Sequence, residues 1–324
     1  MNTFNTPILF LVFNRLDTTK QVFKMIRKVA PQKLYIGSDG PRENRGDDAE
    51  KVKVVREYLL NSIDWDCEVK TLFREKNLGC GKAPSQAITW FFKNEEMGII
   101  LEDDCLPSLS FFYYCEELLN KYKNNARIYH IAGHNPLTYT ETPYSYYFAR
   151  INHSTGWASW RRVWEKYHFH VTGLDDFLKH KKINAIFTRN VDRYYWVQMF
   201  KDMIKQQSEN VSQVTYWDTQ WAYAIFNNDG ICINPAKNFI THIGFGVDAT
   251  HTVSIDSYLY NQERYEISAI LHPDKILIDN KNIILINKLA FGIKWNYIIN
   301  QKIRKIFGEK LVVKLKSLLK KSKI

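Results

Sequence analysis

The sequence predicts an α/β fold, in which a mostly parallel β-sheet is flanked by helices and followed by a basic helical tail. Two patterns lead to this prediction. Apolar runs with the composition of buried strands alternate four times with segments of helical period in the first ~120 residues. Each run is also followed by polar or glycine residues, and open α/β sheets bind ligands at the carboxyl ends of their strands. Crossovers between such strands are expected to be right-handed.

The first half of the chain carries the clearest alternation. Buried strands are short runs of Ile, Leu, Val and Phe, whereas helices repeat apolar side chains every three or four residues. The elements expected on this basis are a strand at 7–15, a helix from 17 or 18 to 29, a strand at 33–38, a helix at 47–59, a strand at 67–73, a helix containing 87–92, a strand at 99–101 and a helix from about 110 to 122.

The second half is less regular, but several segments still have a defined pattern. β-branched and aromatic runs indicate strands, and turn residues such as Asn, Asp and Gly mark where helices end. The expected elements are strands at 128–132 and 231–233, a β-prone aromatic run at 144–148, a segment at 156–160 that leads into a helix, helices at 190–207 and 217–227, and a loop rich in Gly and His at 239–251.

Three acids, Glu102, Asp103 and Asp104, follow the strand at 99–101 directly. Adjacent carboxylates repel one another unless a cation or hydrogen-bond donors offset their charge. Carboxylate oxygens suit Mg²⁺ or Mn²⁺, and such ions are usually held by one or two carboxylates together with substrate phosphates. The acids therefore predict a metal–diphosphate site, and the alternative is an acidic loop that faces water.

Other polar groups fall at the ends of the neighbouring predicted strands. Asn14 and Arg15 follow the first strand, Asp39 follows the second, and the glycine loop 77–82 ends at Lys82. We expect these groups to meet at one edge of the sheet. Arg15 and Asp39 either contact a ligand or form a structural ion pair. Lys82 and the loop amides either bind phosphate or form an exposed start of a helix.

The charge of the chain is concentrated at one end. The formal net charge is +11, and residues 292–324 supply +9 of it, with ten Lys and Arg against one acid. The preceding residues are therefore close to neutral, which argues against a nucleic-acid-binding surface across the whole domain and predicts no nucleic-acid partner.

Several further classes are disfavoured by motifs that the sequence lacks. The five cysteines are odd in number and have no CxxC spacing, which favours reduced thiols of the cytosol over a disulfide framework or a zinc site. No apolar run reaches the ~18 residues of a membrane-spanning helix, and residues 1–6 do not resemble the start of a signal peptide. GxGxxG and GxxxxGK[ST] are both absent, which disfavours a dehydrogenase-type dinucleotide site and a P-loop.

Three segments together resemble the GT-A-fold, nucleotide-sugar-dependent glycosyltransferases: Pro-Ile-Leu-Phe-Leu-Val-Phe-Asn-Arg at 7–15, Asn-Leu-Gly-Cys-Gly-Lys at 77–82, and Glu-Asp-Asp at 102–104. The resemblance is closest to the N-acetylglucosaminyltransferase I-like group and its bacterial relatives in surface-polysaccharide synthesis, which carry a Glu-Asp-Asp variant of the Asp-x-Asp motif. Trp217-Asp218 and the loop 241–246 look like two later motifs of that group. The resemblance covers roughly residues 7–251 and implies a Rossmann-like GT-A fold.

The resemblance implies a role for each polar residue on the donor side. Asp104 would bind Mn²⁺ or Mg²⁺, Asp103 would face the ribose or sugar of the donor, and Glu102 would act through metal-bound water. Asp39 would contact the base of the nucleotide. Arg15 would meet the diphosphate or the base edge, with Asn14 beside it.

On the acceptor side, Asp218 matches the general base that takes a proton from the attacking hydroxyl, which implies single displacement and inversion. Its alternative role is a helix N-cap. His242 and His251 are either ligands of the metal or the donor phosphate, with His242 as the expected second metal ligand, or structural residues. Trp157 and Trp160 either stack on an acceptor sugar or belong to the aromatic core.

The C-terminal segment 271–324 is predicted to be a separate helical unit after the catalytic domain 1–270, whose nucleotide-binding half spans about 1–135 and acceptor half about 136–270. Apolar residues recur at helical spacing over 298–319 among many lysines. A basic amphipathic helix of this kind favours contact with an anionic membrane surface, at ~1 kcal/mol per nearby cation, with Trp295 and Tyr297 at headgroup level. The alternative is a helix packed on the domain with its lysines in water.

These observations predict a metal-dependent inverting glycosyltransferase that uses a nucleotide diphosphate sugar, a UDP-sugar by default, and a glycan or lipid-linked acceptor. It would be cytoplasmic and peripheral on the inner face of the cell membrane. One alternative is a sugar nucleotidyltransferase, which needs a glycine-rich basic loop that residues 14–17 do not supply. Another is a non-catalytic, membrane-associated protein that binds nucleotides or polyanions.

Overall fold

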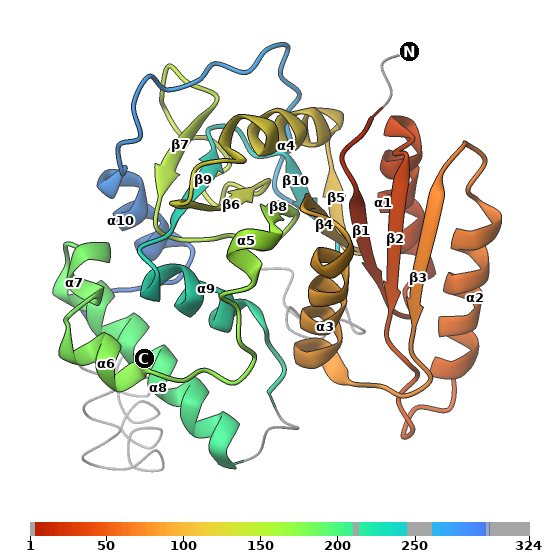
Figure 1. The fold of residues 1–324 in the computed structure, drawn as a ribbon, viewed down its shortest axis with the longest axis horizontal. Coiled ribbons are helices and arrows are strands. Elements are labelled where there is room, and N and C mark those ends of the chain that lie inside the picture. The colour runs from red at the N-terminus through yellow and green to blue at the C-terminus, as the bar shows by residue number, and fades with distance from the viewer. Residues whose placement is uncertain (1–3, 210–213, 245–260, 296–297, 299–324) are drawn as a thin grey trace, which may run out of the picture.

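The structure is a computed structural model that describes residues 4–209, 214–244, 261–295 and 298. Within these residues, an eight-stranded sheet runs through the middle of the molecule and helices pack against it (Figure 1). The strands are β1 (Ile8–Val12), β2 (Lys33–Ser38), β3 (Glu68–Phe73), β4 (Met97–Glu102), β5 (Cys105–Pro107), β6 (Ile128–Ala132), β7 (Tyr146–Ala149), β8 (Trp157–Trp160), β9 (Ile231–Pro235) and β10 (Ile240–His242). The helices are α1 (Leu16–Val29), α2 (Asp48–Asn61), α3 (Gly79–Asn94), α4 (Leu109–Tyr122), α5 (Arg161–Trp164), α6 (Leu174–Lys179), α7 (Ile183–Ile186), α8 (Asn190–Glu209), α9 (Asp218–Asn227) and α10 (Asn280–Leu289).

The large sheet is mixed but mostly parallel, as the sequence predicts. Its order is β3-β2-β1-β4-β8-β6-β9-β7. The first four strands are parallel to one another, β8 is antiparallel to both β4 and β6, and β7 is antiparallel to β9. The chain moves outward from β1 to β3 and then crosses back to β4, so the topological switch point lies between β1 and β4. Ligands in such sheets bind outside the carboxyl ends of the strands at a switch point.

Helices cover both faces of the parallel half because its crossovers run in opposite directions. Right-handed crossovers place α1 and α2 on one face and α3 on the other. Accordingly, α1 contacts α2 and α4, whereas α3 contacts β1, β2 and α5. Strands covered on both faces are uniformly apolar, and Ile99, Ile100 and Leu101 of β4 have no exposed surface. This confirms the buried strand predicted before the three acids.

A small antiparallel sheet joins the two halves of the molecule. β5 follows the acids directly and pairs with β10, with Cys105 opposite His242. The backbone N–H of Ile243 also donates to the carbonyl oxygen of Asp104 at 2.8 Å. The sequence analysis did not predict this pairing, because each strand has only three residues and the partners are far apart along the chain.

Two other differences from the predicted elements are local. Helix α1 begins at Leu16, before the predicted capping residues, because the carbonyl of Arg15 already accepts hydrogen bonds from the backbone and side chain of Thr19. The short helices α6 and α7 were not predicted, since four to six residues are too few to show a period.

Of the predicted C-terminal segment, the structure describes residues 271–295 and 298, which include α10. The backbone N–H of Asp279, which caps α10, donates to the carbonyl of Phe148 in β7 at 2.8 Å. Nearly all of the predicted amphipathic helix at 298–319, together with His251 and Tyr297, lies outside the described residues. Among the described helices, none combines the length and the apolar character that crossing a membrane requires.

Candidate functional site

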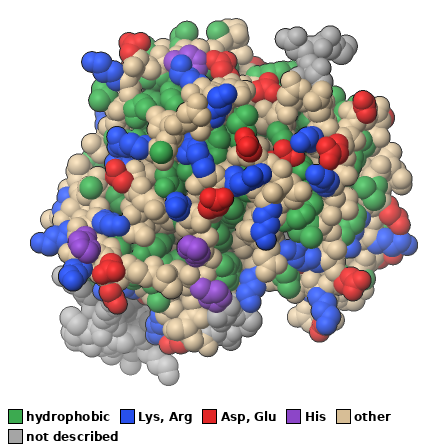
Figure 2. Space-filling view, in the orientation of Figure 1, with side chains coloured by type: hydrophobic (Ala, Val, Ile, Leu, Met, Phe, Trp, Pro, Cys, Tyr) green, Lys and Arg blue, Asp and Glu red, His purple; other side chains and the backbone are tan. Residues whose placement is uncertain are grey.

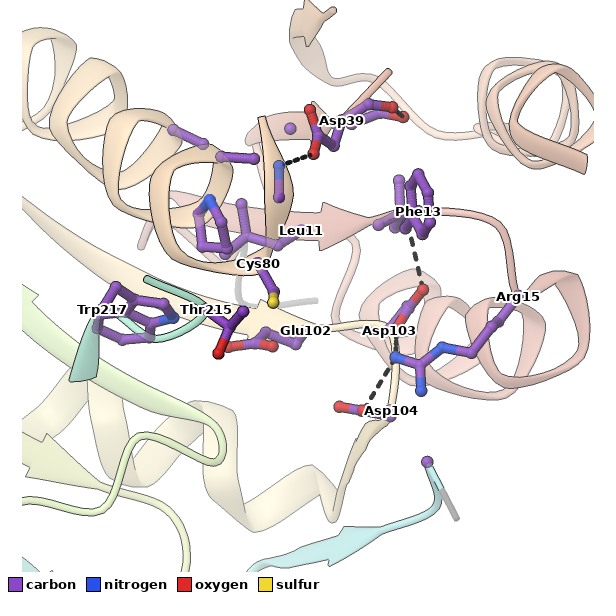
Figure 3. Close-up of a pocket in the computed structure, with 18 of the residues that line it drawn as sticks. Leu11, Phe13, Arg15, Asp39, Cys80, Glu102, Asp103, Asp104, Thr215 and Trp217 are labelled. Carbon is purple, nitrogen blue, oxygen red and sulfur yellow. Dashed lines mark hydrogen bonds and ion pairs between the residues drawn. The ribbon is translucent and has the colours of Figure 1, made fainter. Parts of the chain in front are cut away.

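A cavity of about 650 Å³ opens at the carboxyl ends of β1, β2 and β4, beside the switch point. Helix α3 forms one wall, and the segment that leads into α9 forms another. Most of the residues predicted for the site line it, and these are Asn14, Arg15, Asp39, Glu102, Asp103, Asp104, Asp218 and His242. Lys82, Trp157 and Trp160 are not among the lining residues. Figure 3 shows how the acids and their neighbours lie.

The acidic tip, defined as Glu102, Asp103 and Asp104, is held by one arginine. Nη2 of Arg15 donates to Oδ1 of Asp103 and, at 2.9 Å, to Oδ2 of Asp104. The second oxygen of Asp103 accepts from the backbone N–H of Phe13 at 3.3 Å. Glu102 points the other way, toward Thr215 and Trp217 (Figure 3). The guanidinium therefore offsets the charge of two acids, and the third faces the opposite wall of the cavity.

The three acids have different proton affinities because their surroundings differ. Burial, with the neighbouring charges of Asp104 and Asp103, raises the pKa of Glu102 to about 8. Burial also raises the pKa of Asp103 to about 6, although Arg15 opposes the shift. The pKa of Asp104 is lowered, because Arg15 and His242 outweigh the effect of burial. Two of the three carboxylates share one arginine, and the raised pKa of Glu102 reflects the crowding of acids that a bound cation would relieve.

His242 reaches the tip through the β5–β10 pairing. Its Nε2 lies 3.7 Å from Oδ2 of Asp104. Burial lowers the pKa of His242, while Asp104 acts in the opposite direction. A neutral imidazole is the form that ligates metal ions. The structure therefore brings together the two residues expected to be metal ligands.

The donor set fits Mn²⁺ or Mg²⁺ only as a partial site. Carboxylate oxygens with one imidazole suit Mn²⁺, and two ligands of one ion can lie as far apart as Asp104 and His242 do. Among the described residues, no three His, Cys, Asp or Glu side chains are gathered so that they could hold a metal ion by themselves. The remaining ligands would have to come from a substrate, as is usual for Mg²⁺ at phosphates.

Asp39 lines the cavity and binds backbone amides at the same time. Its carboxylate accepts hydrogen bonds from the backbone N–H groups of Gly40, Leu78 and Gly79 at 2.9–3.1 Å. The side chain of Asn77 returns a bond to the carbonyl of Gly40 at 2.7 Å. Asp39 therefore ties the end of β2 to the start of α3, and it takes up two loop amides that were expected to bind phosphate.

The alternative ion pair between Arg15 and Asp39 is wrong for this structure, since Arg15 bonds the acidic tip instead. Lys82 lies one turn into α3, which begins at Gly79. It is not in the wall of the cavity, so the structure does not bring it to the other predicted donor-side residues. The sequence could show that these residues were close to strand ends, but it could not show which partner each one takes.

The two tryptophans predicted to stack on an acceptor sugar are inside the core. Trp157 has no exposed surface, and Trp160 is 3 % exposed. Trp157 stacks on Trp217 with ring centroids 5.6 Å apart, and the guanidinium of Arg162 lies over Trp160. The structure corrects the acceptor role in favour of the aromatic-core alternative, because neither indole has a free face. Trp157 instead supports Trp217, which lines the cavity.

Asp218 is an exposed residue at the first position of α9. Its Oδ1 accepts from the N–H of Thr219 at 2.9 Å, whereas the N-cap position is occupied by Trp217 without a side-chain cap. Its charge contributes to the raised pKa of Glu102, so the two carboxylates face the same space. Asp218 is therefore not itself the N-cap residue, although its carboxylate accepts from one free N–H of the first turn, and it lines the cavity that the end of β1 also lines.

The sequence analysis missed two arginines of the cavity wall, Arg42 and Arg74. Arg42 bonds both oxygens of Asp48, whose pKa it lowers to about 2, and Asn14 donates to the same carboxylate at 2.7 Å. Both arginines come shortly after the ends of β2 and β3, so the strand-end rule could have found them. Ser154 and Thr155 also line the cavity but precede an antiparallel strand, where no such rule applies.

Comparisons with known proteins give only distant structural matches. No protein-family model matches the sequence, and no curated protein does. A mannosyltransferase from Pyrobaculum calidifontis, solved with GDP-Man and Mn²⁺, matches with a TM-score of 0.35 and 13% identity over 52% of this chain and 49% of that chain. S. aureus TarS (residues 1–349) matches with a TM-score of 0.39 and 10% identity over 73% and 59%. HddC from Yersinia pseudotuberculosis matches with a TM-score of 0.32 and 10% identity over 51% and 81%.

These similarities are too low for an argument about activity. The present chain spans about half the length of the mannosyltransferase. The matches include, besides the mannosyltransferase, a 4-diphosphocytidyl-2C-methyl-D-erythritol synthase and a UDP-glucose pyrophosphorylase. What can be said of function therefore rests on the cavity and its residues.

Proposed function

We propose that this protein is a metal-dependent, inverting glycosyltransferase that takes a sugar from a nucleotide diphosphate sugar. The observation that carries the proposal is the meeting of the acidic tip, Arg15, His242 and Asp218 in one cavity at the switch point of the sheet. Several carboxylates beside one arginine suit a cation–diphosphate pair, and the separate carboxylate of Asp218 at the start of α9 suits an acceptor hydroxyl. The sequence resemblance to GT-A glycosyltransferases supports the same assignment, with UDP as the default nucleotide.

The residues divide the reaction between them. Asp104 and His242 would hold Mn²⁺ or Mg²⁺, which, when bound, offsets the charge that develops on the departing diphosphate. Arg15 adds a second positive charge on the same side. Asp218 takes the proton from the acceptor hydroxyl as its oxygen bonds to the anomeric carbon and the bond to the diphosphate breaks. Attack from the face opposite the leaving group inverts the anomeric configuration.

The test is to incubate the protein with Mn²⁺ and a panel of nucleotide sugars and to measure nucleoside diphosphate release. Thermal shift with the same panel identifies the donor, because a ligand that binds only the folded protein stabilises it. A glycosyltransferase releases the nucleoside diphosphate, whereas a nucleotidyltransferase running in reverse consumes pyrophosphate and forms a nucleoside triphosphate. A protein that binds none of the donors would contradict the proposal.

Two variants separate the proposed roles. Asp104→Asn should abolish turnover and weaken metal-dependent donor binding, and wild-type activity with Mn²⁺ in this variant would remove Asp104 from the metal site. Asp218→Asn should keep donor binding close to that of the wild type and lose transfer. A loss of donor affinity in Asp218→Asn would show that Asp218 binds the donor and is not the base.

The proposed acceptor is a glycan or a lipid-linked glycan, and the proposed location is the inner face of the membrane. Large apolar side chains are exposed at Leu271, Leu277, Leu289 and Trp295, within one segment that also carries several lysines. Apolar side chains among lysines favour a surface that meets anionic lipid. Figure 2 shows basic side chains spread over the face in view, with acids among them.

A further inference from the structure

We propose that Arg15 is a built-in counter-ion of the acidic tip, which must release Asp104 before a divalent cation can bind there. Cation and nucleoside diphosphate then bind cooperatively, because the diphosphate gives Arg15 a new partner. This inference rests on the proposed function. It adds that Arg15 leaves Asp104 before the cation binds, and that the affinities for cation and nucleotide are coupled. The residue that couples cation binding to nucleotide binding is Arg15 and not one of the acids.

The geometry shows that Arg15 and a metal ion compete for one atom. Oδ2 of Asp104 accepts from Nη2 of Arg15 at 2.9 Å. The same oxygen faces Nε2 of His242 at 3.7 Å, so it is the atom that an ion shared by Asp104 and His242 would use. The guanidinium also bonds Asp103, so it bridges two neighbouring carboxylates in the way that a cation would.

The space on one side of this contact is already filled. Gly244 lies against both partners, since a Cβ at this position would lie 2.3 Å from Oδ2 of Asp104 and 2.8 Å from Nη1 of Arg15. An ion cannot take up Oδ2 of Asp104 while the guanidinium stays in place, because both the volume and the positive charge of Arg15 oppose it. Cation binding therefore requires Arg15 to move.

A bound nucleoside diphosphate supplies oxygen ligands for the ion and a new hydrogen-bond partner for Arg15. No three described His, Cys, Asp or Glu side chains form a metal site by themselves, so the ion needs oxygens from a ligand. A diphosphate offers oxygens to the ion and also accepts the planar fork of a guanidinium. Moving Arg15 from carboxylate to phosphate keeps its hydrogen bonds while it frees Asp104. The affinity of each ligand should then rise by the same factor in the presence of the other.

The test measures Mn²⁺ binding directly, by the loss of the electron paramagnetic resonance signal of free Mn²⁺, with and without UDP or the nucleoside diphosphate found in the donor screen. In the wild type, Mn²⁺ alone should bind weakly, and the nucleotide should tighten it by about 10- to 100-fold. In Arg15→Met, Mn²⁺ alone should bind at least about tenfold more tightly than in the wild type, and the nucleotide should add correspondingly less.

Arg42→Met is the matched control. It removes one positive charge from the same cavity, but Arg42 bonds Asp48 and not the acidic tip. Its Mn²⁺ affinity without nucleotide should stay close to that of the wild type. Equal tightening in both variants would mean a general effect of charge and would overturn the proposal, as would an Arg15→Met protein that binds Mn²⁺ no better than the wild type.

Arg15→Lys keeps the charge, but its shorter side chain cannot place an ammonium where Nη2 of Arg15 donates to both Asp103 and Asp104, so its Mn²⁺ affinity should lie between those of the wild type and Arg15→Met. If Arg15→Met does not fold, Arg15→Gln removes the same charge with a polar side chain, and wild-type Mn²⁺ affinity in Arg15→Gln would then count against the counter-ion role. The two levels of failure are distinguishable. If no variant binds Mn²⁺ with any nucleoside diphosphate, the proposed function is wrong. If Mn²⁺ and nucleotide bind but Arg15 does not affect their coupling, only this inference is wrong.

Discussion

Gly244 offers the most direct test of how the site is packed. A Cβ at this position would lie 2.3 Å from Oδ2 and 2.5 Å from Cβ of Asp104, and 2.8 Å from Nη1 of Arg15. Gly244→Ala therefore has to displace Asp104, Arg15 or its own backbone. The backbone of Asp104 is held in place, because it follows β4 and its carbonyl accepts from the N–H of Ile243. The displacement therefore falls on the side chain of Asp104, the proposed metal ligand.

The size of the effect follows from overpacking. Extra methyl groups in a well-packed site typically cost about 1–3 kcal/mol. For 324 residues, an unfolding entropy of about 2.1 cal/mol/K per residue gives about 0.7 kcal/mol/K. The melting temperature should therefore fall by about 1.5–4 °C, and nucleotide binding in the presence of Mn²⁺ should weaken by about tenfold through loss of one charge-assisted contact.

The assay is differential scanning fluorimetry with and without Mn²⁺ and UDP, on three variants. Gly230→Ala also meets close neighbours, 2.8 Å from the ring of Tyr129, but outside the cavity, so it should lower the melting temperature and leave affinity unchanged. Gly46→Ala meets nothing within 4 Å and should change neither. A Gly244→Ala protein with wild-type stability and affinity would refute the packing described for Arg15 and Asp104.

Three further predictions concern other parts of the chain. Burial lowers the pKa of His134 in the folded state to about 4, so between that value and about 6.5 only the unfolded state binds a proton at this residue. The free energy of unfolding should therefore rise as the pH rises through this window and fall as the pH is lowered. His134→Gln should flatten this dependence by up to about 1.4 kcal/mol per pH unit in urea denaturation at pH 4.5–7, and an unchanged slope would contradict the assignment. Asp39→Asn should speed the hydrogen exchange of the Leu78 and Gly79 amides by about tenfold, because the carboxylate that accepts from both is lost. If NMR shows the same exchange rates in the variant and the wild type, other groups hold the loop. Removal of residues 299–324 should weaken sedimentation with phosphatidylglycerol vesicles at low salt, and equal binding by the shortened chain would place any membrane contact elsewhere.

The sequence was informative wherever structure depends on local pattern. β6 has the predicted bounds, α9 begins within a residue of the predicted start, and β4 is buried as expected. Apolar periodicity decides which residues form an element, because each strand or helix has to bury one face. The end of a parallel strand then marks where polar residues gather, and this rule is enough to predict that Arg15 and the acidic tip lie together.

Local sequence pattern does not predict which strands pair or which polar and aromatic side chains are buried. The three-residue strands β5 and β10 bring His242 to Asp104, and no sequence feature of either segment indicates which strand it pairs with. Tryptophan suits both a sugar-binding surface and a core, so only packing could show that Trp157 stands behind Trp217 and touches no solvent. Asp39 likewise has the same carboxylate whether it accepts from a nucleotide base or from backbone amides.

The amino-acid order alone thus determined the α/β class, the position of the acids at a strand end and the edge of the sheet where a site should lie. These depend on periodicity and on chain direction, which are properties of neighbouring residues. The tertiary structure decided which partner each polar group takes. Arg15 bonds the acids, and Asp39 bonds the amides of the loop after β3. These donors and acceptors come within reach of one another only when distant segments fold together. Polar groups removed from water then form hydrogen bonds with the partners nearest to them.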